Sequence, residues 1–142
     1  MAFRYTLTAL ANQQFSALRG RQKLAVLDFL ILIEAQGCAA MGYRLTGGEP
    51  LERICVKHLE GTWRIAVAFA SEQHAWILLI GEHDAKNPDR DIYATLYLMI
   101  DQSPPSGMRT KPACCDPAGL PPIYDQAEFL ADRLRALRRG RR

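Results

Sequence analysis

Two basic side chains are predicted to meet across a β-hairpin, where together they suit a phosphate group. Residues 51–58 and 63–69 each alternate apolar and polar side chains, the pattern of half-buried strands. If Glu60 and Gly61 are the two turn residues, Lys57 lies directly opposite Arg64. Like charges in that arrangement destabilise a sheet by up to about 1 kcal/mol, so a bound anion would relieve the repulsion.

Small side chains border this cationic pair. Cys55, Ala66 and Ala68 share its strand face and leave a shallow groove that fits a phosphodiester. Arg53 lies one step further along the same face. The alternative is an ordinary solvated sheet face without a ligand. The register depends on the turn, because a change of one residue would separate the two cations.

Net charge limits how the chain can bind nucleic acid. Its 142 residues carry 18 Lys and Arg against 15 Asp and Glu, a net charge of +3. Residues 128–142 hold a local excess of +4, which leaves residues 1–127 at −1. Bulk charge therefore does not clamp long nucleic acid on the body, and any basic site there must be local.

The composition predicts a cytoplasmic protein with reduced thiols. The longest apolar stretch, residues 24–33, is about half as long as a bilayer span and is interrupted by Asp28. The first residues lack the pattern of a signal peptide. Two of the four cysteines, Cys114 and Cys115, are adjacent, and none shows C-x-x-C spacing, so disulfides are not expected.

The residue patterns predict an α+β domain over residues 1–101. An N-terminal strand and a helical hairpin should pack on a mostly antiparallel four-stranded sheet. Thr8 and Asp91 are the expected caps of the first and last helices. In chain order the expected elements are a strand at residues 3–8, helices at 10–18 and 21–36, strands at 51–58, 63–69 and 75–80, and a helix at 92–100.

Residues 102–142 are predicted to form a Pro-rich linker followed by a basic terminal helix. Six of the eight prolines lie in residues 101–124, which disfavours regular structure. Helical spacing of apolar residues returns over residues 125–139, with arginines on the other face. The segment therefore reads as an extension of the N-terminal domain.

This order of elements resembles the RelE/ParE superfamily of bacterial type II toxins. The likeness spans roughly residues 3–100 and is strongest in VKHLEGTWRIAVAF and WILLIGEHDAKNPDRDIYATLY, residues 56–69 and 76–97. It implies a toxin of a toxin–antitoxin pair that cleaves mRNA on the ribosome. In that reaction the ribose 2′-OH attacks the adjacent phosphate, which leaves a cyclic phosphate and a free 5′-OH.

The resemblance also implies a role for each candidate residue. Lys57 and Arg64 would hold the developing dianionic phosphorane. His83 is the leading acid/base candidate, because an unperturbed imidazole titrates near neutral pH. Tyr93 would orient the 2′-OH or stack on a base. Three further cations are expected to bind the substrate: Arg53, Lys86 and Arg90.

The expected mechanism uses neither a metal nor a cofactor. His58 ranks below His83 as a candidate, because strand alternation places it on the face opposite Lys57. The histidines and cysteines show no zinc-ligand spacing, and the chain has no phosphate-cradling glycine motif.

Two other functions stay open beside an endoribonuclease. A toxin of the same fold can bind a protein target such as gyrase, and a non-catalytic interaction module can keep the fold without the chemistry. The expected partners are a cognate antitoxin protein and, for the nuclease, the ribosome and mRNA. No membrane partner is expected.

Overall fold

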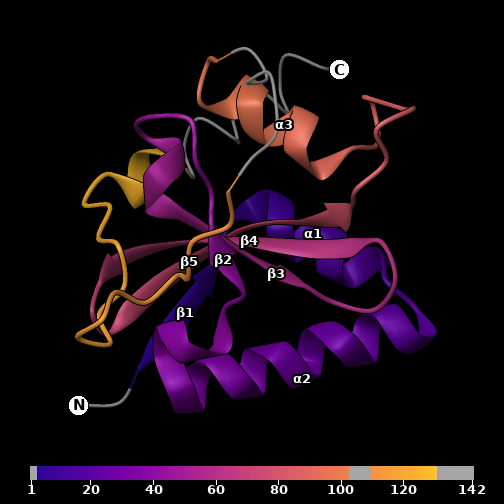
Figure 1. Ribbon diagram of the computed structural model, residues 1–142. Coiled ribbons are helices and arrows are strands. Elements are labelled where there is room, and N and C mark those ends of the chain that lie inside the picture. The colour runs from indigo at the N-terminus through magenta and orange to yellow at the C-terminus, as the bar shows by residue number, and fades with distance from the viewer. Residues whose placement is uncertain (1–2, 103–109, 131–142) are drawn as a thin grey trace.

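The protein has an α+β fold built on a five-stranded mixed sheet, seen edge-on in Figure 1. The computed structural model describes residues 3–102 and 110–130. In chain order the elements are β1 (Arg4–Leu7), α1 (Ala9–Ala17), α2 (Gly20–Gln36), the 3-10 helix η1 (Gly37–Ala40), β2 (Tyr43–Arg44), the 3-10 helix η2 (Leu51–Arg53), β3 (Ile54–His58), β4 (Trp63–Ser71), β5 (His74–Glu82) and α3 (Ile92–Met99).

The strand order is β1-β5-β4-β3-β2, so the N-terminal strand lies beside the last strand of the sheet. β1 runs parallel to β5, and the remaining neighbours are antiparallel. The predicted α+β class and the run of three antiparallel strands are confirmed. The predicted count of four strands is wrong, because β2 adds a fifth strand that is too short to show an alternating pattern.

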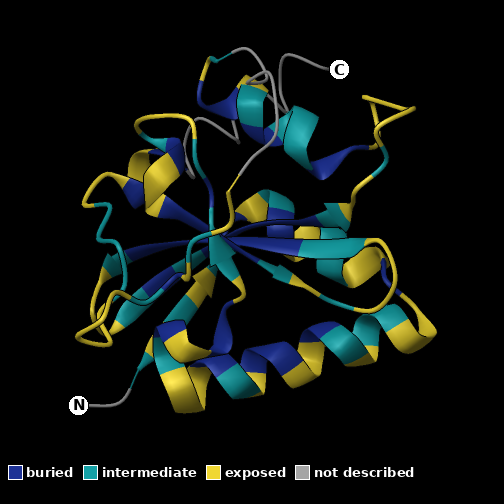
Figure 2. Ribbon diagram, viewed as in Figure 1, coloured by how far each residue is buried: buried dark blue, intermediate teal, exposed yellow. Residues whose placement is uncertain are grey.

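Helices cover both faces of the sheet, α2 on one side and α3 on the other (Figure 1). The α2 side buries Val26, Phe29 and Ile33 against strand residues such as Val67 and Ile77. Dark blue, buried surfaces accordingly face inward from both layers in Figure 2. This two-sided burial explains why β4 and β5 are apolar almost throughout.

The two predicted helix caps are confirmed. Thr8 Oγ1 accepts a hydrogen bond from Ala11 N–H at 3.0 Å and so caps α1. The same hydroxyl donates to Leu78 O in β5 at 2.9 Å, which joins the start of α1 to the sheet. The Asp91 carboxylate accepts from Ala94 N–H at the start of α3. Caps of this kind satisfy backbone donors that a helix itself leaves unpaired.

A β-bulge in β5 decides which of its side chains face α3. Ala66 pairs with Leu79 and Val67 pairs with Ile77, so Leu78 is the extra residue. Leu78 and Leu79 both lie in the core beneath α3. Because side chains along a strand alternate with a period of two, the bulge reverses the faces of every later residue. The C-terminal end of β5 therefore presents its odd-numbered positions to α3.

Part of the predicted Pro-rich linker packs on the sheet. Arg44 N–H donates to Pro112 O at 2.7 Å, and Tyr43 forms a β-bridge with Ala113. Further along, Ile123 forms a bridge with Phe69 of β4. Most of the helix predicted for residues 125–139 lies outside the described residues.

Two disulfides anchor this segment, and the prediction of reduced thiols is wrong. Cys55 in β3 is bonded to Cys114, and Cys38 in η1 is bonded to Cys115. Adjacent cysteines cannot easily bond to each other, but here each reaches a different element. The partners lie 59 and 77 residues apart in sequence, so spacing along the chain could not reveal the pairing. Within the described residues, no helix combines the length and apolar character that a bilayer crossing demands.

Candidate functional site

The β3–β4 hairpin turns through three residues, which overturns the predicted cationic pair. Leu59 N–H donates to Trp63 O at 2.9 Å, so the loop consists of Glu60, Gly61 and Thr62. Gly61 has a φ of 63°, the left-handed conformation that closes such a loop and that glycine adopts without strain.

The pairing that results is His58 with Arg64, and Lys57 with Ile65. Directly paired residues share a sheet face, and Ile65 belongs to the core on the α2 side. Lys57 and Arg64 therefore start from opposite faces of the sheet, and the interpretation of the two as facing cations is wrong. His58, which alternation ranked lower, is the residue that shares the face of Arg64.

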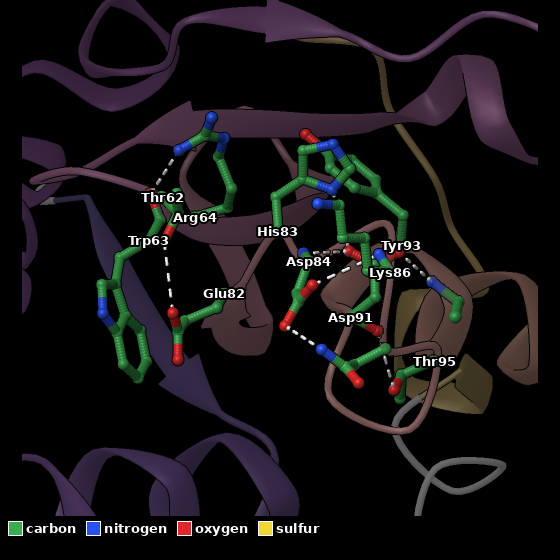
Figure 3. Close-up of polar contacts among 12 residues, drawn as sticks. Thr62, Trp63, Arg64, Glu82, His83, Asp84, Lys86, Asp91, Tyr93 and Thr95 are labelled. Atoms are coloured by element: carbon green, nitrogen blue, oxygen red, sulfur yellow. Dashed lines mark hydrogen bonds and ion pairs between the residues drawn. The ribbon is translucent and has the colours of Figure 1, made fainter.

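Arg64 extends from β4 toward the α3 side, whereas its neighbour Trp63 points the other way (Figure 3). Gly81 of β5 lies opposite Arg64, and His83 N–H donates to Thr62 O at 2.8 Å. The hairpin and the end of β5 thus bring His58, Arg64 and His83 onto one face. His83 is placed there by the bulge at Leu78.

The start of α3 packs against Gly81 of β5. A Cβ atom at Gly81 would lie 3.5 Å from Cβ of Ile92, the first residue of α3, which is an ordinary van der Waals distance. The residues on either side of Ile92, Asp91 and Tyr93, lie beside His83.

His83 is held by a buried carboxylate. With its proton on Nδ1, the imidazole donates to Asp91 Oδ1 at 2.8 Å (Figure 3). Asp91 is only 8% exposed, and its carboxylate also accepts from the N–H groups of Asp84 and Ala94 at 2.9 and 3.1 Å. These bonds fix the carboxylate, which in turn favours the tautomer that leaves His83 Nε2 free to exchange a proton.

Two tyrosines connect the histidines. The hydroxyl oxygens of Tyr43 and Tyr93 lie 2.7 Å apart, and His58 Nε2 lies 3.2 Å from the Tyr43 hydroxyl. At the other end, the Tyr93 ring packs edge-on against the His83 ring with centroids 4.9 Å apart. Side chains from β2, β3 and α3, together with His83 and Asp91 from the two ends of the loop between β5 and α3, therefore form one continuous cluster.

The surroundings of His58 favour its neutral form. Burial lowers the pKa of His58 below its ordinary value, and the positive charges of Arg64 and Lys111 lower it further. His83 and Lys57 act in the same direction. A neutral imidazole at pH 7 can accept a proton, which is the requirement for a general base.

Tyr93 is held as a neutral phenol. Burial raises the pKa of Tyr93 far above its ordinary value of 10, and its hydrogen bond with Tyr43 raises it further. Arg64 opposes the shift, since a nearby cation favours the phenolate. Tyr93 therefore serves as a hydrogen-bond donor or as a ring surface rather than as a base.

The Arg64 guanidinium has no carboxylate partner among the described residues. Its Nη1 donates to the carbonyl oxygens of Gly61 and Trp63, both at 3.0 Å. Its Nε is buried and has no hydrogen-bond partner in residues 3–102 and 110–130. A cation oriented by carbonyl oxygens and left without a counter-ion suits an anionic ligand.

A pocket of about 380 Å³ opens beside His58. Its lining residues are Gly42, Tyr43, Lys57, His58 and Lys111. Lys111 Nζ lies 5.1 Å from the centroid of the Tyr43 ring, which places a second cation close to the histidine. In the described parts of the chain, neither lysine forms an ion pair with a carboxylate.

Of the three predicted substrate-binding cations, Arg53 lies away from this cluster. It pairs with Glu49 at 2.9 Å and donates to Ile123 O at 2.7 Å, just before the opposite end of β3 from His58. Lys86 and Arg90 belong to the loop between His83 and Asp91, where their backbone N–H groups bond within the loop.

Sequence reasoning gave no site role to Tyr43, Lys111 or Asp91. Tyr43 lies in a two-residue strand and Lys111 in the Pro-rich segment, so neither belongs to a periodic pattern. Asp91 was identified only as a helix cap, although its position eight residues after His83 offered a signal. Among the described residues, no group of three His, Cys, Asp or Glu side chains is arranged to hold a metal ion.

Comparisons with known proteins add no relatives: no family model matches the chain, no curated protein matches it, and no solved structure matches its fold. The function of the protein is therefore inferred from the geometry of the cluster.

Proposed function

We propose that this protein is an RNA-cleaving toxin of the RelE/ParE type that works by acid/base catalysis without a metal ion. One observation carries the proposal. His58, Arg64 and His83 share one face of the sheet, with Asp91 fixed behind His83. Two imidazoles and a guanidinium are the groups that phosphodiester transfer to a neighbouring hydroxyl requires.

The proposed reaction assigns one proton transfer to each histidine. Neutral His58 takes the proton of the ribose 2′-OH, and the 2′ oxygen attacks the adjacent phosphorus. The bond from phosphorus to the 5′ oxygen then breaks, and His83 gives a proton to that leaving oxygen. The products are a 2′,3′-cyclic phosphate and a free 5′-OH, so atoms and charges balance. Asp91 supports the charged imidazole of His83, as a carboxylate does in other oriented histidine sites.

Arg64 supports the transition state in this scheme. Negative charge grows on the non-bridging oxygens as the phosphorane forms, and the positive charge of Arg64, which has no carboxylate partner among the described residues, would stabilise them. Tyr93 offers a neutral hydroxyl to the ribose or a ring on which a base can stack. These roles keep Arg64, His83 and Tyr93 from the predicted set and replace Lys57 with His58 beside the reacting phosphate.

The pocket beside His58 suits the backbone next to the cleaved bond. Lys57 and Lys111 line it, so a neighbouring phosphate would meet two cations that have no carboxylate partner among the described residues. Residues 1–127 carry a net charge of −1, so a basic site on them must be local. The two lysines provide such a site. A ribosome that presents mRNA would supply the remaining binding energy.

The proposal includes the cytoplasm as the place of action and a cognate antitoxin as a partner. Disulfides are rare in cytoplasmic proteins, because thiol reductants there keep cysteines reduced. The two disulfides would then form under oxidising conditions and hold Lys111 against the site. Redox state thereby becomes a variable that any activity assay must control.

The direct test is cleavage of a defined RNA by purified protein, both free with a chelator present and on ribosomes in the magnesium buffer that keeps them assembled. Wild type should release a 2′,3′-cyclic phosphate, and His58→Ala and His83→Ala should each slow cleavage by about 100-fold or more. His74→Ala is the matched control, since His74 begins β5 at the other end of the sheet and bonds Thr6. Intact RNA with the wild-type protein in both settings would refute the proposal.

Growth assays separate the remaining functions. Induced wild type should arrest growth with cut messenger, whereas the His58 and His83 variants should not. Arrest with intact messenger would favour a toxin that binds a protein target. Normal growth with the wild-type protein, expressed without an antitoxin, would favour a non-catalytic interaction module.

A further inference from the structure

A second pocket, of about 580 Å³, opens where Arg44 of β2 meets the segment of residues 112–122. This segment is part of the orange trace beside β2 in Figure 1. The pocket shares no lining residue with the pocket beside His58. Apart from Arg44 and Asp116, its described lining is uncharged and largely apolar, with four prolines, Leu120 and the two disulfide cysteines Cys114 and Cys115. An enclosure of this kind, apolar with a few polar groups, is typical of small-molecule sites.

The Arg44 guanidinium enters this pocket without a partner. Arg44 pairs with Cys55 of β3, so its side chain leaves the sheet on the side of the Cys55–Cys114 disulfide. The side chain is half-buried, and within residues 3–102 and 110–130 it forms neither a hydrogen bond nor an ion pair. Its Nε is fully buried. Partial burial removes water that would solvate the charge, so an anion bound through the Nη groups would be stabilised.

Asp116 does not neutralise Arg44. It is the one carboxylate among the described residues of the lining, and its Oδ1 accepts from the N–H groups of Ala118 and Leu120, both at 2.9 Å. Those bonds hold the carboxylate within its own loop. The described lining therefore carries one positive and one negative charge, so a second negative charge on a ligand would be repelled by Asp116.

The wall opposite Arg44 is fixed before any ligand binds. Its first residue is tied to β2 by the bond from Arg44 N–H to Pro112 O, and just beyond its end Tyr124 N–H donates to Phe69 O at 2.7 Å. Between these points the two disulfides hold adjacent residues. The prolines restrict the backbone further. A ligand would therefore lose little binding energy to ordering the protein.

We propose that this pocket binds a small organic monoanion, in which a carboxylate meets Arg44 and an apolar group lies against the prolines and Leu120. The single cation selects an anion, the apolar lining selects a carbon-rich body, and Asp116 disfavours a phosphate dianion. None of the residues proposed to act on RNA lines the pocket, so this site does not depend on the proposed function.

Benzoate is a suitable probe, because it joins one carboxylate to a flat apolar ring. We expect a dissociation constant on the order of 1 mM for so small a ligand. Titration of the full-length, oxidised protein at constant ionic strength, followed by NMR, should give saturable shifts of the Ala113 and Leu120 N–H signals. Benzyl alcohol, which lacks the charge, and inorganic phosphate, which lacks the apolar body, should each bind at least about tenfold more weakly.

Substitutions on the two sides of the pocket test the assignment. Arg44→Gln should weaken benzoate binding by about tenfold or more, because it removes the charge. The matched control is Arg19→Gln, since Arg19 is an arginine whose side chain bonds only to the carbonyl oxygens of Ser16 and Leu18 among the described residues. It should bind benzoate as wild type does.

A variant of the apolar wall covers the case in which Arg44→Gln fails to fold. Leu120→Glu, at a 40% exposed position, should also weaken benzoate binding by about tenfold or more, because it brings a negative charge to the carboxylate. Leu98→Glu, at a 52% exposed leucine on α3, should leave it unchanged. The dispersion of the NMR spectrum shows whether each variant is folded.

Three results would overturn the proposal. The first is the absence of saturable shifts at Ala113 and Leu120 up to about 20 mM benzoate, roughly 20 times the expected constant. The second is wild-type affinity in a folded Arg44→Gln or Leu120→Glu variant. The third is phosphate binding as tight as that of benzoate, which would mean that the apolar lining selects nothing.

Discussion

His83 Nδ1 lies 2.8 Å from Asp91 Oδ1, and the same Asp91 carboxylate caps helix α3. One buried side chain therefore both stabilises the fold and orients a candidate catalytic group. Because a helix cap and a histidine partner have different chemical requirements, substitutions at Asp91 can separate the two roles.

Asp91→Asn should impair RNA cleavage and should cost less stability than Asp91→Ala. Asn keeps one oxygen that can cap α3, but its amide NH2 then faces a buried N–H donor, so the free energy of unfolding should fall by about 1–3 kcal/mol. Its neutral amide does not balance a charged imidazole, and cleavage should fall by about 100-fold. Asp91→Ala, the control, should lose more stability. Urea denaturation and the RNA assay give both quantities, and full activity of Asp91→Asn would contradict the role of the carboxylate.

Arg64 and Lys57 should differ sharply as alanine variants. Arg64 lies on the face of both histidines, so its loss should reduce kcat by about 100-fold. Lys57 lines only the pocket beside His58, so its loss should raise KM several-fold and leave kcat within about threefold. Steady-state kinetics on one RNA decide the matter. Equal losses of kcat in the two variants would contradict this difference, because Lys57 would then act on the reacting phosphate as Arg64 does.

Protein stability should fall on the acid side of pH 6.5, partly because of His58. Burial and nearby cations lower the pKa of His58 in the folded state, so the unfolded chain binds more protons in this pH range. The stabilisation from neutral His58 is complete above pH 6.5 and is lost as the pH falls through the lowered pKa. Urea midpoints between pH 7 and pH 5 should decline less in His58→Gln than in wild type.

His74 supplies an internal comparison for that experiment. Burial and the charge of Arg4 also lower the pKa of His74, so His74→Gln should flatten the same part of the curve. Only His58→Gln should also change the acid limb of the RNA cleavage profile. An unchanged slope of stability against pH in both variants would show that neither histidine has a lowered pKa in the folded protein.

Reduction of the disulfides should lower both stability and substrate binding. Each bond closes a long loop and is expected to contribute about 2–4 kcal/mol to the free energy of unfolding. Cys114→Ser and Cys115→Ser should each lower the melting temperature in the absence of reductant. Because Lys111 lies three residues before Cys114, these variants should also raise KM for RNA.

Thiol labelling checks the premise of that prediction. The protein purified without reductant should take up no alkylating reagent until it is reduced, and then four groups per chain. Labelling of four thiols in the native, unreduced protein would contradict the disulfides. A melting temperature that reductant does not change would show that they contribute little to stability.

Local patterns were sufficient for the elements and for some of the chemistry. Alternation located the hairpin and the buried strand before His83, and short polar side chains before helical spacing identified Thr8 and Asp91 as caps. These signals depend on residues within one or two turns of each other, so no tertiary information is needed to find them.

The faces of the sheet required the folded chain. The hairpin loop has three residues, with Gly61 in a left-handed conformation, rather than the two predicted from the sequence. The resulting register places His58 instead of Lys57 opposite Arg64. A bulge at Leu78 then turned His83 to that same face. Each change involves a single residue, yet a period of two converts it into a complete reversal of side-chain direction.

The sequence by itself determined the α+β order of elements, the helix caps and the presence of titratable and cationic side chains near one hairpin. Only the tertiary structure decided which of them meet, that Tyr43 joins them, and that Cys114 and Cys115 tie Lys111 beside them. Periodicity and capping are set by neighbouring residues, whereas register, bulges and crosslinks are set by contacts between distant parts of the chain.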